Sequence, residues 1–229
     1  MNNWKNIAIK CLEDEANSIS RLIPNIDNGF QKAVELILEC HGKVVITGVG
    51  KSGHIGAKIA ATLSSTGTPS FYVSPLDMYH GDLGVVSEGD IVIGISYSGQ
   101  TDELLKIVPS LTERNIPIIG ISGFRDSILA KNSNAHICIH VEEEARPLRL
   151  APTCSSTATL AMGDALACCL MEARGFKEND FAKFHPGGML GKRLLTKASD
   201  VMRKDNLPIT APDTLLGEAV TLVSQGRLG

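Results

Sequence analysis

The 229-residue sequence predicts a doubly wound α/β fold, a three-layer sandwich built on a five-stranded parallel sheet. Five short runs rich in β-branched residues alternate, for the most part, with helical segments, as in a parallel sheet whose strands are connected by helices. The runs are continuously apolar and do not alternate with polar residues, which is typical of strands buried on both faces. The five runs are 43–48, 69–74, 90–96, 117–122 and 136–141.

The elements before and between these runs are predicted to be helical. Residues 3–40 show helical periodicity twice, with a break near Pro24, and therefore predict two opening helices. The first run, KVVITG, ends in glycine and is followed by the helical segment HIGAKIAATLSSTG. The segment SGQTDELLKIVPSLTERN repeats this order after the third run, and a short helix follows the fourth.

A long helix is predicted over roughly 153–174, with small residues on much of its surface. Small side chains allow another helix to approach closely, either within the same core or from a second subunit, and the sequence leaves both open. Cys168 and Cys169 share its apolar pattern, in which a thiol usually behaves as a small hydrophobic side chain. A further helical turn precedes FHPGGMLGK, and the segment 198–229 is too short to form a core of its own.

The composition indicates a globular protein of the cytoplasm. Hydrophobic residues make up 43% of the chain and the formal net charge is −3, so nucleic acid and anionic membranes are not expected partners. Glu13, Asp14 and Glu15 lie where a signal peptide needs an apolar core, and no run reaches the roughly 18 apolar residues of a membrane span. The six cysteines have neither paired nor zinc-finger spacing, so disulfides and structural zinc are not expected.

The turn after the first run raises the question of a nucleotide site. Its sequence, ITGVGKSGHIG, has the G-x-G-x-x-G spacing of a dinucleotide-binding turn, whereas a P-loop needs a glycine where this chain has Val45. An NAD site also needs an acidic residue at the end of the next strand, and the second run ends in Ser74. We therefore expect no nucleotide cofactor.

The turn after the third run carries three hydroxyl groups at the start of a helix, which indicates a phosphate site. Ser96, Ser98 and Thr101 lie beside the free backbone N–H groups of a helix N-terminus, and ordinary N-capping explains one hydroxyl but not three. The turns after the first, third and fifth runs should meet, because ligands of parallel sheets bind at the carboxyl ends of the strands. The predicted phosphate-binding residues are Gly50, Ser52, Ser96, Ser98 and Thr101.

Five motifs, in order, resemble the sugar isomerase (SIS) domain family and, within it, the arabinose 5-phosphate isomerases. They lie within about 40–195 and read GVGKSGHIGAKIAATLSSTGTPSFYV, HGDLG, ISYSGQTDE, LAPTCSSTATLAMGDALA and FHPGGMLGK. The resemblance implies a flavodoxin-like SIS domain over 1–197 and the start of a CBS domain over 198–229, with SDVM as its first residues. It also implies a cytoplasmic homotetramer that interconverts D-ribulose 5-phosphate and D-arabinose 5-phosphate for Kdo synthesis, in lipopolysaccharide or capsule.

The implied reaction needs a base for a carbon-bound proton, a group that stabilises the enediolate oxygen, and an acid–base group for hydroxyl protons, but no cofactor and no metal. Among the residues at matching motif positions, Glu144 is the predicted carbon base and Lys51 the predicted charge-stabilising group. His185 and His80 are proton-shuttle candidates, since imidazole both donates and accepts protons. The full predicted catalytic set is Lys51, Glu103, Glu144, His185 and His80.

Two positions depart from the family pattern. Arg146 and Arg149 add charge and bulk beside the predicted base and bear on substrate preference. Two alternatives to the arabinose 5-phosphate isomerase stay open: an isomerase of another sugar phosphate, and a SIS sensor domain without turnover. Sensors usually carry a basic helix-turn-helix segment, which this sequence does not show, and the acid–base set favours an enzyme.

Overall fold

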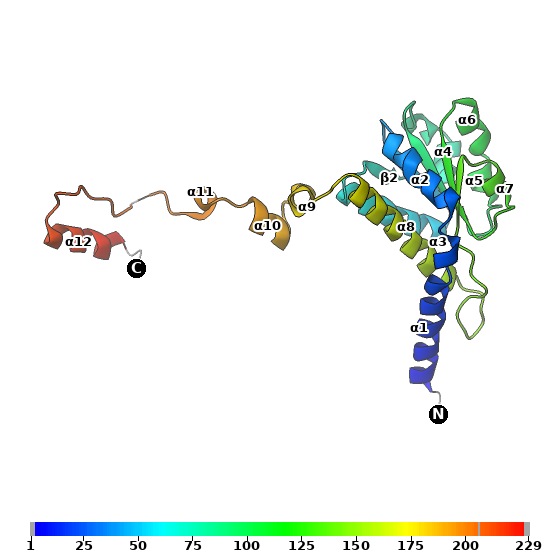
Figure 1. Ribbon diagram of the computed structural model, residues 1–229, viewed down its shortest axis with the longest axis horizontal. Helices are drawn as coiled ribbons and strands as arrows, with labels where there is room; N and C mark the ends of the chain where they lie inside the picture. The colour runs from blue at the N-terminus through cyan, green and yellow to red at the C-terminus, as the bar shows by residue number, and fades with distance from the viewer. Residues whose placement is uncertain (1–2, 206, 227–229) are drawn as a thin grey trace.

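The computed structural model describes residues 3–205 and 207–226 and confirms the doubly wound α/β sandwich (Figure 1). Each predicted run forms a strand, although the fifth strand ends three residues before the predicted boundary. The strands are β1 (Val44–Gly48), β2 (Ser70–Tyr72), β3 (Ile91–Ile95), β4 (Ile118–Ser122) and β5 (Ala135–Cys138). All neighbours are parallel, in the flavodoxin-like order β2-β1-β3-β4-β5, which places the ligand crevice beside β1 and β3.

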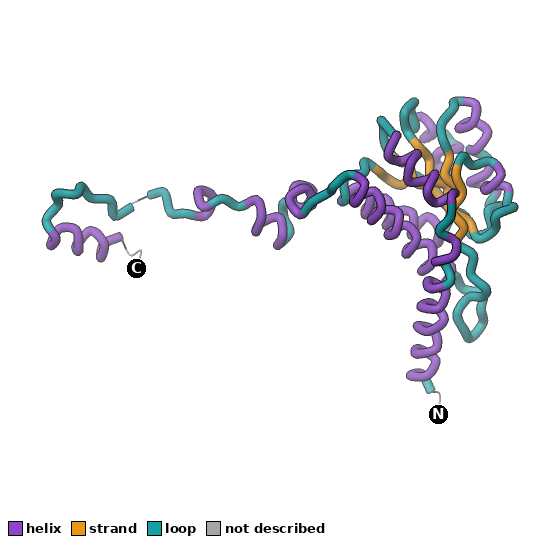
Figure 2. The backbone as a smooth tube through the Cα atoms, in the orientation of Figure 1, coloured by secondary structure: helices purple, strands orange, loops and turns teal. Residues whose placement is uncertain are grey.

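Helices cover both faces of the sheet, and Figure 2 shows the strands enclosed between helical segments. The two predicted opening helices are confirmed, with a short 3-10 turn that contains Pro24 between them. α1 projects away from the sandwich and packs against α8 (Figure 1). In chain order, the helices up to this point are α1 (Trp4–Ser20), η1 (Ile23–Asn25), α2 (Asn28–Glu39), α3 (Lys51–Ser65), α4 (Pro75–Tyr79), η2 (Asp82–Val85), α5 (Asp102–Leu105), α6 (Val108–Glu113), α7 (Ile128–Lys131) and α8 (Cys154–Ala173).

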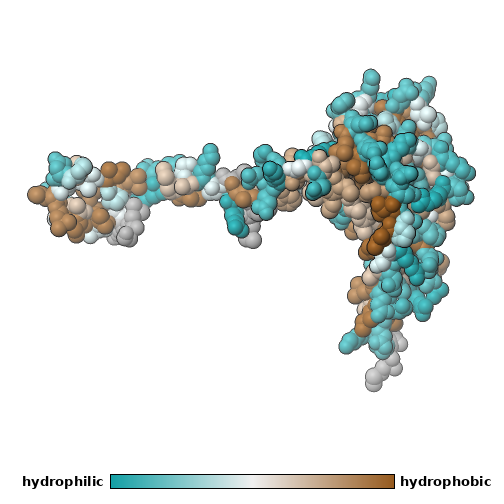
Figure 3. Space-filling view, viewed as in Figure 1, coloured by the Kyte–Doolittle hydropathy of each residue, from teal (hydrophilic) through white to brown (hydrophobic). Residues whose placement is uncertain are grey.

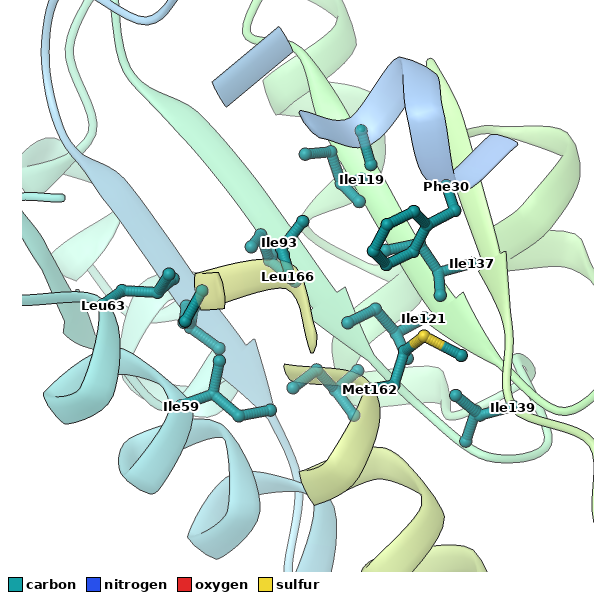
Figure 4. Packing of buried hydrophobic residues seen from close by; sticks show 14 of the residues in the cluster. Phe30, Ile59, Leu63, Ile93, Ile119, Ile121, Ile137, Ile139, Met162 and Leu166 are labelled. Carbon is teal, nitrogen blue, oxygen red and sulfur yellow. The ribbon is translucent and has the colours of Figure 1, made fainter. Parts of the chain in front are cut away.

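Two apolar clusters, one on each face of the sheet, hold the layers together. Successive strand residues point to opposite faces, so Ile93 of β3 packs with residues of α2, α3 and α8, whereas Val92 packs with residues of α4 to α7. Figure 4 shows the larger cluster, in which Ile59 of α3 and Met162 and Leu166 of α8 lie on the strand side chains. Burial of such a side chain contributes about 1.5–3 kcal/mol. Both faces of the sheet are buried and apolar, which confirms the prediction drawn from the lack of alternation between apolar and polar residues in the strands.

The predicted long helix is α8, and on one side its small residues pack inside the core of the same chain. Ala158 is buried, and a Cβ on Gly163 would lie 2.5 Å from the Ile59 side chain, so α3 and α8 are in close contact. The prediction for Cys168 and Cys169 is wrong: both are exposed, because the helix turns them away from its buried face. By length and composition α8 could span a membrane, but half of that stretch is buried inside the protein, as in a core helix.

Beyond α8 the chain forms an arm that leaves the sandwich (Figure 1). Ile209 and Leu216 of this arm are 76% and 79% exposed, and Figure 3 shows apolar surface at its far end. The helices of the arm are α9 (Glu178–Phe184), α10 (Met189–Leu195), α11 (Ala198–Val201) and α12 (Leu216–Gly226).

His136 of β5 gives the fold a pH dependence. Its Nε2 lies 2.8 Å from the Ser122 hydroxyl, which lies 3.1 Å from that of Ser127. Burial, followed by the charge of Arg125, lowers the pKa of His136, whereas the charge of Asp27 raises it. The unfolded chain therefore binds this proton more tightly than the folded protein. The contribution to stability is fully present above about pH 6.5 and is lost as the pH falls below that value.

Replacing His136 with glutamine should remove part of this acid sensitivity, which for one proton is at most about 1.4 kcal/mol per pH unit. The measurement is the free energy of urea unfolding at about pH 7.5 and about pH 5.5 for the wild type and His136→Gln. His41→Gln, at an exposed position, is the matched control. If the free energy of unfolding falls by the same amount between the two pH values in the wild type and in His136→Gln, His136 is not the source of the acid sensitivity.

Candidate functional site

The turns after β1 and β3 and the loop after β5 meet at the carboxyl edge of the sheet, as predicted. Gly48, at the end of β1, is paired with Ile95, at the end of β3, so the two turns begin side by side. A pocket of about 410 Å³ lies there, within the usual range for small-molecule sites. Its lining includes Lys51 and Ser52 from the first turn, Tyr97 from the second, Glu144 from the loop, and Ser155, Ser156 and Thr159 from α8.

The carboxylate of Glu144 is held by the start of α8. Its Oε2 accepts hydrogen bonds from the backbone N–H groups of Thr153, at 2.8 Å, and Ser155, at 3.2 Å, and from the Thr153 hydroxyl at 3.2 Å. Its Oε1 accepts one, from the Ser155 hydroxyl. Glu144 therefore caps α8, and Oε1 keeps acceptor capacity for a proton, because each carboxylate oxygen has two lone pairs.

The groups that bind the Glu144 carboxylate, which we call the Glu144 cradle, are Thr153 and Ser155. They also hold together the two ends of the loop that precedes α8. The backbone N–H of Ala145 donates to the Thr153 hydroxyl oxygen at 2.9 Å, so Glu144 and Ala145 bind Thr153 from both sides. Sequence reasoning assigned no role to Thr153 or Ser155. The one local signal was the position of Thr153 directly before a long apolar helix, which is typical of a capping residue. Its hydroxyl does not cap α8, however, and instead binds Glu144 and Ala145.

Lys51 and Ser52 are the first two residues of α3, and both line the pocket. The N-cap residue, Gly50, has φ +59°, a conformation that favours glycine, and glycine has no side chain with which to cap the helix. The first N–H groups of a helix have no partner within the helix and carry partial positive charge. Together with the Lys51 ammonium, they make this side of the pocket suited to an anionic group.

The structure brings the three hydroxyl groups of the second turn together. The Ser96 hydroxyl lies 2.8 Å from that of Thr101 and 3.4 Å from that of Ser98, and accepts the Gly99 N–H at 3.0 Å. Gly99 has φ +64°, and a Cβ there would lie 2.3 Å from the Ser127 hydroxyl, so only glycine fits. Ser96 is buried and Ser98 exposed, and within the described residues none of the three lines the pocket itself.

Glu103 and His80 lie near this turn but not in the pocket lining. Glu103 is in α5, two residues after Thr101, and is partly buried. His80 directly follows α4, which packs against α5, and its exposed ring stands edge-on to Tyr79 with centroids 5.5 Å apart. Both residues belong to segments that follow strands, α4 after β2 and α5 after β3, so these segments begin at the expected edge of the sheet.

His185 lies away from the pocket within one chain. It follows α9, its Nδ1 is 2.9 Å from the Phe181 carbonyl oxygen, and its ring stacks on that of Phe181. Glu144 is bound at the opposite end of α8, a helix of 20 residues, which at 1.5 Å per residue is about 30 Å long (Figure 1). Among the residues described, no group of three or more His, Cys, Asp or Glu side chains is placed to hold a metal ion.

Arg146 and Arg149 do not line the pocket. Arg149 forms an ion pair with Glu143 at 2.7 Å, and the neighbouring Glu142 pairs with Arg21. These groups are about half exposed or more, so each pair contributes only about 0–1 kcal/mol. The charge of Arg149 is thus directed to an acidic neighbour outside the pocket, and Arg146 lines a separate small cavity together with Glu142 and Glu143.

The family comparison agrees with this geometry. A family model described as the SIS domain matches residues 37–168, more than half of the chain. The chain belongs to the SIS domain family. The match includes every pocket residue named above and ends before His185.

Two curated relatives and one solved structure are similar to this SIS protein. Arabinose 5-phosphate isomerase KdsD of Yersinia pestis is 48% identical over 219 residues, which cover 95% of this chain and 67% of that protein. Arabinose 5-phosphate isomerase KpsF of Escherichia coli O6:H1 is 45% identical over 219 residues, with the same coverage. The solved structure, E. coli CFT073 c3406 in complex with arabinose 5-phosphate, is 41% identical with a TM-score of 0.77, and covers 81% of this chain and 100% of that one. These relatives confirm the resemblance drawn from the five motifs.

Proposed function

We propose that this protein is an arabinose 5-phosphate isomerase, which interconverts D-ribulose 5-phosphate and D-arabinose 5-phosphate. The observation that carries the proposal is the 48% identity to a curated arabinose 5-phosphate isomerase over 95% of the chain. The pocket supports it, because a carboxylate, an ammonium group and a helix N-terminus face one small cavity. These are the groups that an aldose–ketose isomerase requires.

The proposed reaction passes through an enediol. Glu144 Oε1 removes a proton from C1 of the ketose, and the electron pair of that C–H bond forms the C1–C2 double bond while the C2 carbonyl becomes an enediolate oxygen. Lys51 and the start of α3 stabilise this negative charge. A proton moves from the C1 hydroxyl to the C2 oxygen, and Glu144 returns a proton to C2, which leaves the aldehyde at C1.

The phosphate group is proposed to bind at the two adjacent turns, through Gly50, Ser52 and the cluster of Ser96, Ser98 and Thr101. Their hydroxyl and N–H groups are suited to a dianion. His185 is proposed to move hydroxyl and ring-oxygen protons, with Glu103 and His80 as the next candidates. Because His185 lies at the far end of α8 from Glu144, this role requires His185 of a second copy of the chain.

A homotetramer in the cytoplasm is part of the proposal. Trp4 and Leu12 of α1 are 69% and 68% exposed, and apolar surface of this size is typical of a contact between subunits. Residues 198–229 are proposed to open a CBS domain. The product is proposed to enter Kdo synthesis, for lipopolysaccharide or capsule.

The proposal is tested by incubating the purified protein with a panel of pentose, hexose and heptose phosphates and detecting each isomeric product. We expect interconversion of the two pentose 5-phosphates with the highest kcat/KM of the panel. If kcat/KM is higher for a hexose or heptose phosphate, that sugar phosphate replaces arabinose 5-phosphate as the proposed substrate. Binding of a sugar phosphate without turnover would indicate a sensor.

The enediol route predicts that turnover in D₂O places deuterium on the product carbon. The proton held by Glu144 exchanges with solvent on some turnovers, whereas a hydride shift keeps the hydrogen within the substrate. The measurement is mass spectrometry or NMR of the product after many turnovers, with substrate kept in D₂O without protein as the control. If the product carries no deuterium at the reacting carbon even after many turnovers, the enediol route loses its support.

A further inference from the structure

The Tyr97 side chain connects the hydroxyl-rich turn to the chain that leads to Glu144. Tyr97 lies between Ser96 and Ser98 in the turn and lines the pocket. Its hydroxyl donates to the Val141 carbonyl oxygen at 3.0 Å and accepts the Val141 N–H at 3.2 Å. A single phenol oxygen therefore fixes both backbone groups of a residue that precedes Glu144 by three positions.

The sheet itself does not fix this part of the chain. Pairing between β4 and β5 ends where the Ile139 N–H donates to the Ser122 carbonyl oxygen at 2.9 Å. Two residues later the Val141 backbone meets Tyr97, at the point where a further strand residue would need a partner. Buried backbone groups need hydrogen bonds, and Val141 is 6% exposed. Tyr97 thus supplies the hydrogen bonds at Val141 that β4 supplies up to Ile139, and so fixes the segment that leads to Glu144.

The ring of Tyr97 is itself fixed. It packs edge-on against Phe124 with centroids 5.8 Å apart, and the Gly123 N–H donates to the Tyr97 carbonyl oxygen at 2.8 Å. A Cβ on Gly123 would lie 2.8 Å from the Tyr97 ring, so only glycine leaves room for the ring at this position. Burial raises the pKa of the Tyr97 hydroxyl, the hydrogen bond from Val141 lowers it and the charge of Glu144 raises it, with a net rise, so the phenol keeps the proton that it donates.

We propose that Tyr97 is a positioning residue that couples the phosphate turn to the base. The inference rests on the proposed function and deepens it. A phosphate group bound at Ser98 and Thr101 restricts the motion of the turn. Through its two hydrogen bonds to Val141, Tyr97 then restricts the motion of the loop that contains Glu144. A substrate without a phosphate group would leave the base less well placed. Displacement of a catalytic group by about 1 Å costs up to about 100-fold in rate.

The test compares Tyr97→Phe with Tyr79→Phe, a matched control at an exposed tyrosine outside the pocket. Tyr97→Phe keeps the ring and removes both hydrogen bonds to Val141. We expect kcat to fall about 10- to 100-fold with KM changed less than about threefold, and the Val141 amide to exchange with D₂O at least about tenfold faster. Gly123→Ala, which displaces the Tyr97 ring, should also lower kcat and speed the exchange of the Val141 amide.

Inorganic phosphate provides a measurement that does not depend on turnover. Saturating phosphate should slow Val141 amide exchange in the wild type and in Tyr79→Phe, but not in Tyr97→Phe. A wild-type kcat in Tyr97→Phe, or Val141 exchange that phosphate slows equally in all three proteins, would overturn the coupling and leave the isomerase intact. If the wild type turns over neither pentose phosphate, the proposed function fails, while the phosphate effect on Val141 still decides the role of Tyr97.

Discussion

Glu144→Gln is expected to lower kcat by about 10²–10⁴ while KM for arabinose 5-phosphate changes little. Glutamine has the shape of glutamate but cannot accept the proton from carbon. The cradle tolerates it, because the amide oxygen accepts the N–H groups of Thr153 and Ser155 that Oε2 accepts in the wild type. The chemical step is therefore removed while the geometry of the pocket is kept.

The capping role of Glu144 requires a second variant, because loss of activity alone does not separate the base from the helix cap. Glu144→Ala removes the cap as well, and should lower the free energy of unfolding by about 0.5–2 kcal/mol more than Glu144→Gln. Glu143→Gln, at an exposed neighbour paired with Arg149, is the matched control and should keep both activity and stability. Full activity of Glu144→Gln would defeat the base assignment, and equal stability of Glu144→Ala and Glu144→Gln would defeat the cap.

The sequence predicted the fold because its signals are local. The isoleucine-rich runs of β3 and β4 carry no polar alternation, and the structure buries both faces of each. The meeting of Lys51, Tyr97 and Glu144 in one pocket follows from strand direction alone, since the loops after parallel strands share one edge.

Features that depend on long-range contacts could not be predicted in the same way. The partner of the Tyr97 hydroxyl is Val141, 44 residues along the chain, and no local pattern identifies it. The exposure of Cys168 depends on which side of α8 meets α3, which an apolar helix with small residues all round does not specify. A motif such as FHPGGMLGK indicates that His185 has a function, but not in which copy of the chain its ring meets the pocket.

Lys51→Met is expected to lower kcat/KM by about 10²–10³, mostly through kcat. Methionine keeps an unbranched side chain and removes the charge that we assign to the enediolate oxygen, and loss of one such stabilising group typically costs this much. Lys51 is exposed at the first position of α3 and lines the same pocket as Glu144, whereas the hydroxyl cluster lies beside that pocket. For this reason we expect the inhibition constant of inorganic phosphate to rise less than kcat falls.

Lys58→Met is the matched control, because Lys58 lies two turns further along α3 and pairs with Asp164 of α8 at an exposed position. Its kcat/KM should stay within about twofold of the wild type, since an exposed ion pair contributes about 0–1 kcal/mol. Steady-state kinetics with arabinose 5-phosphate, together with inhibition by inorganic phosphate, measure both effects. A Lys51→Met enzyme whose kcat is unchanged and whose phosphate inhibition constant rises by the full factor would assign Lys51 to the phosphate group and remove it from the chemical step.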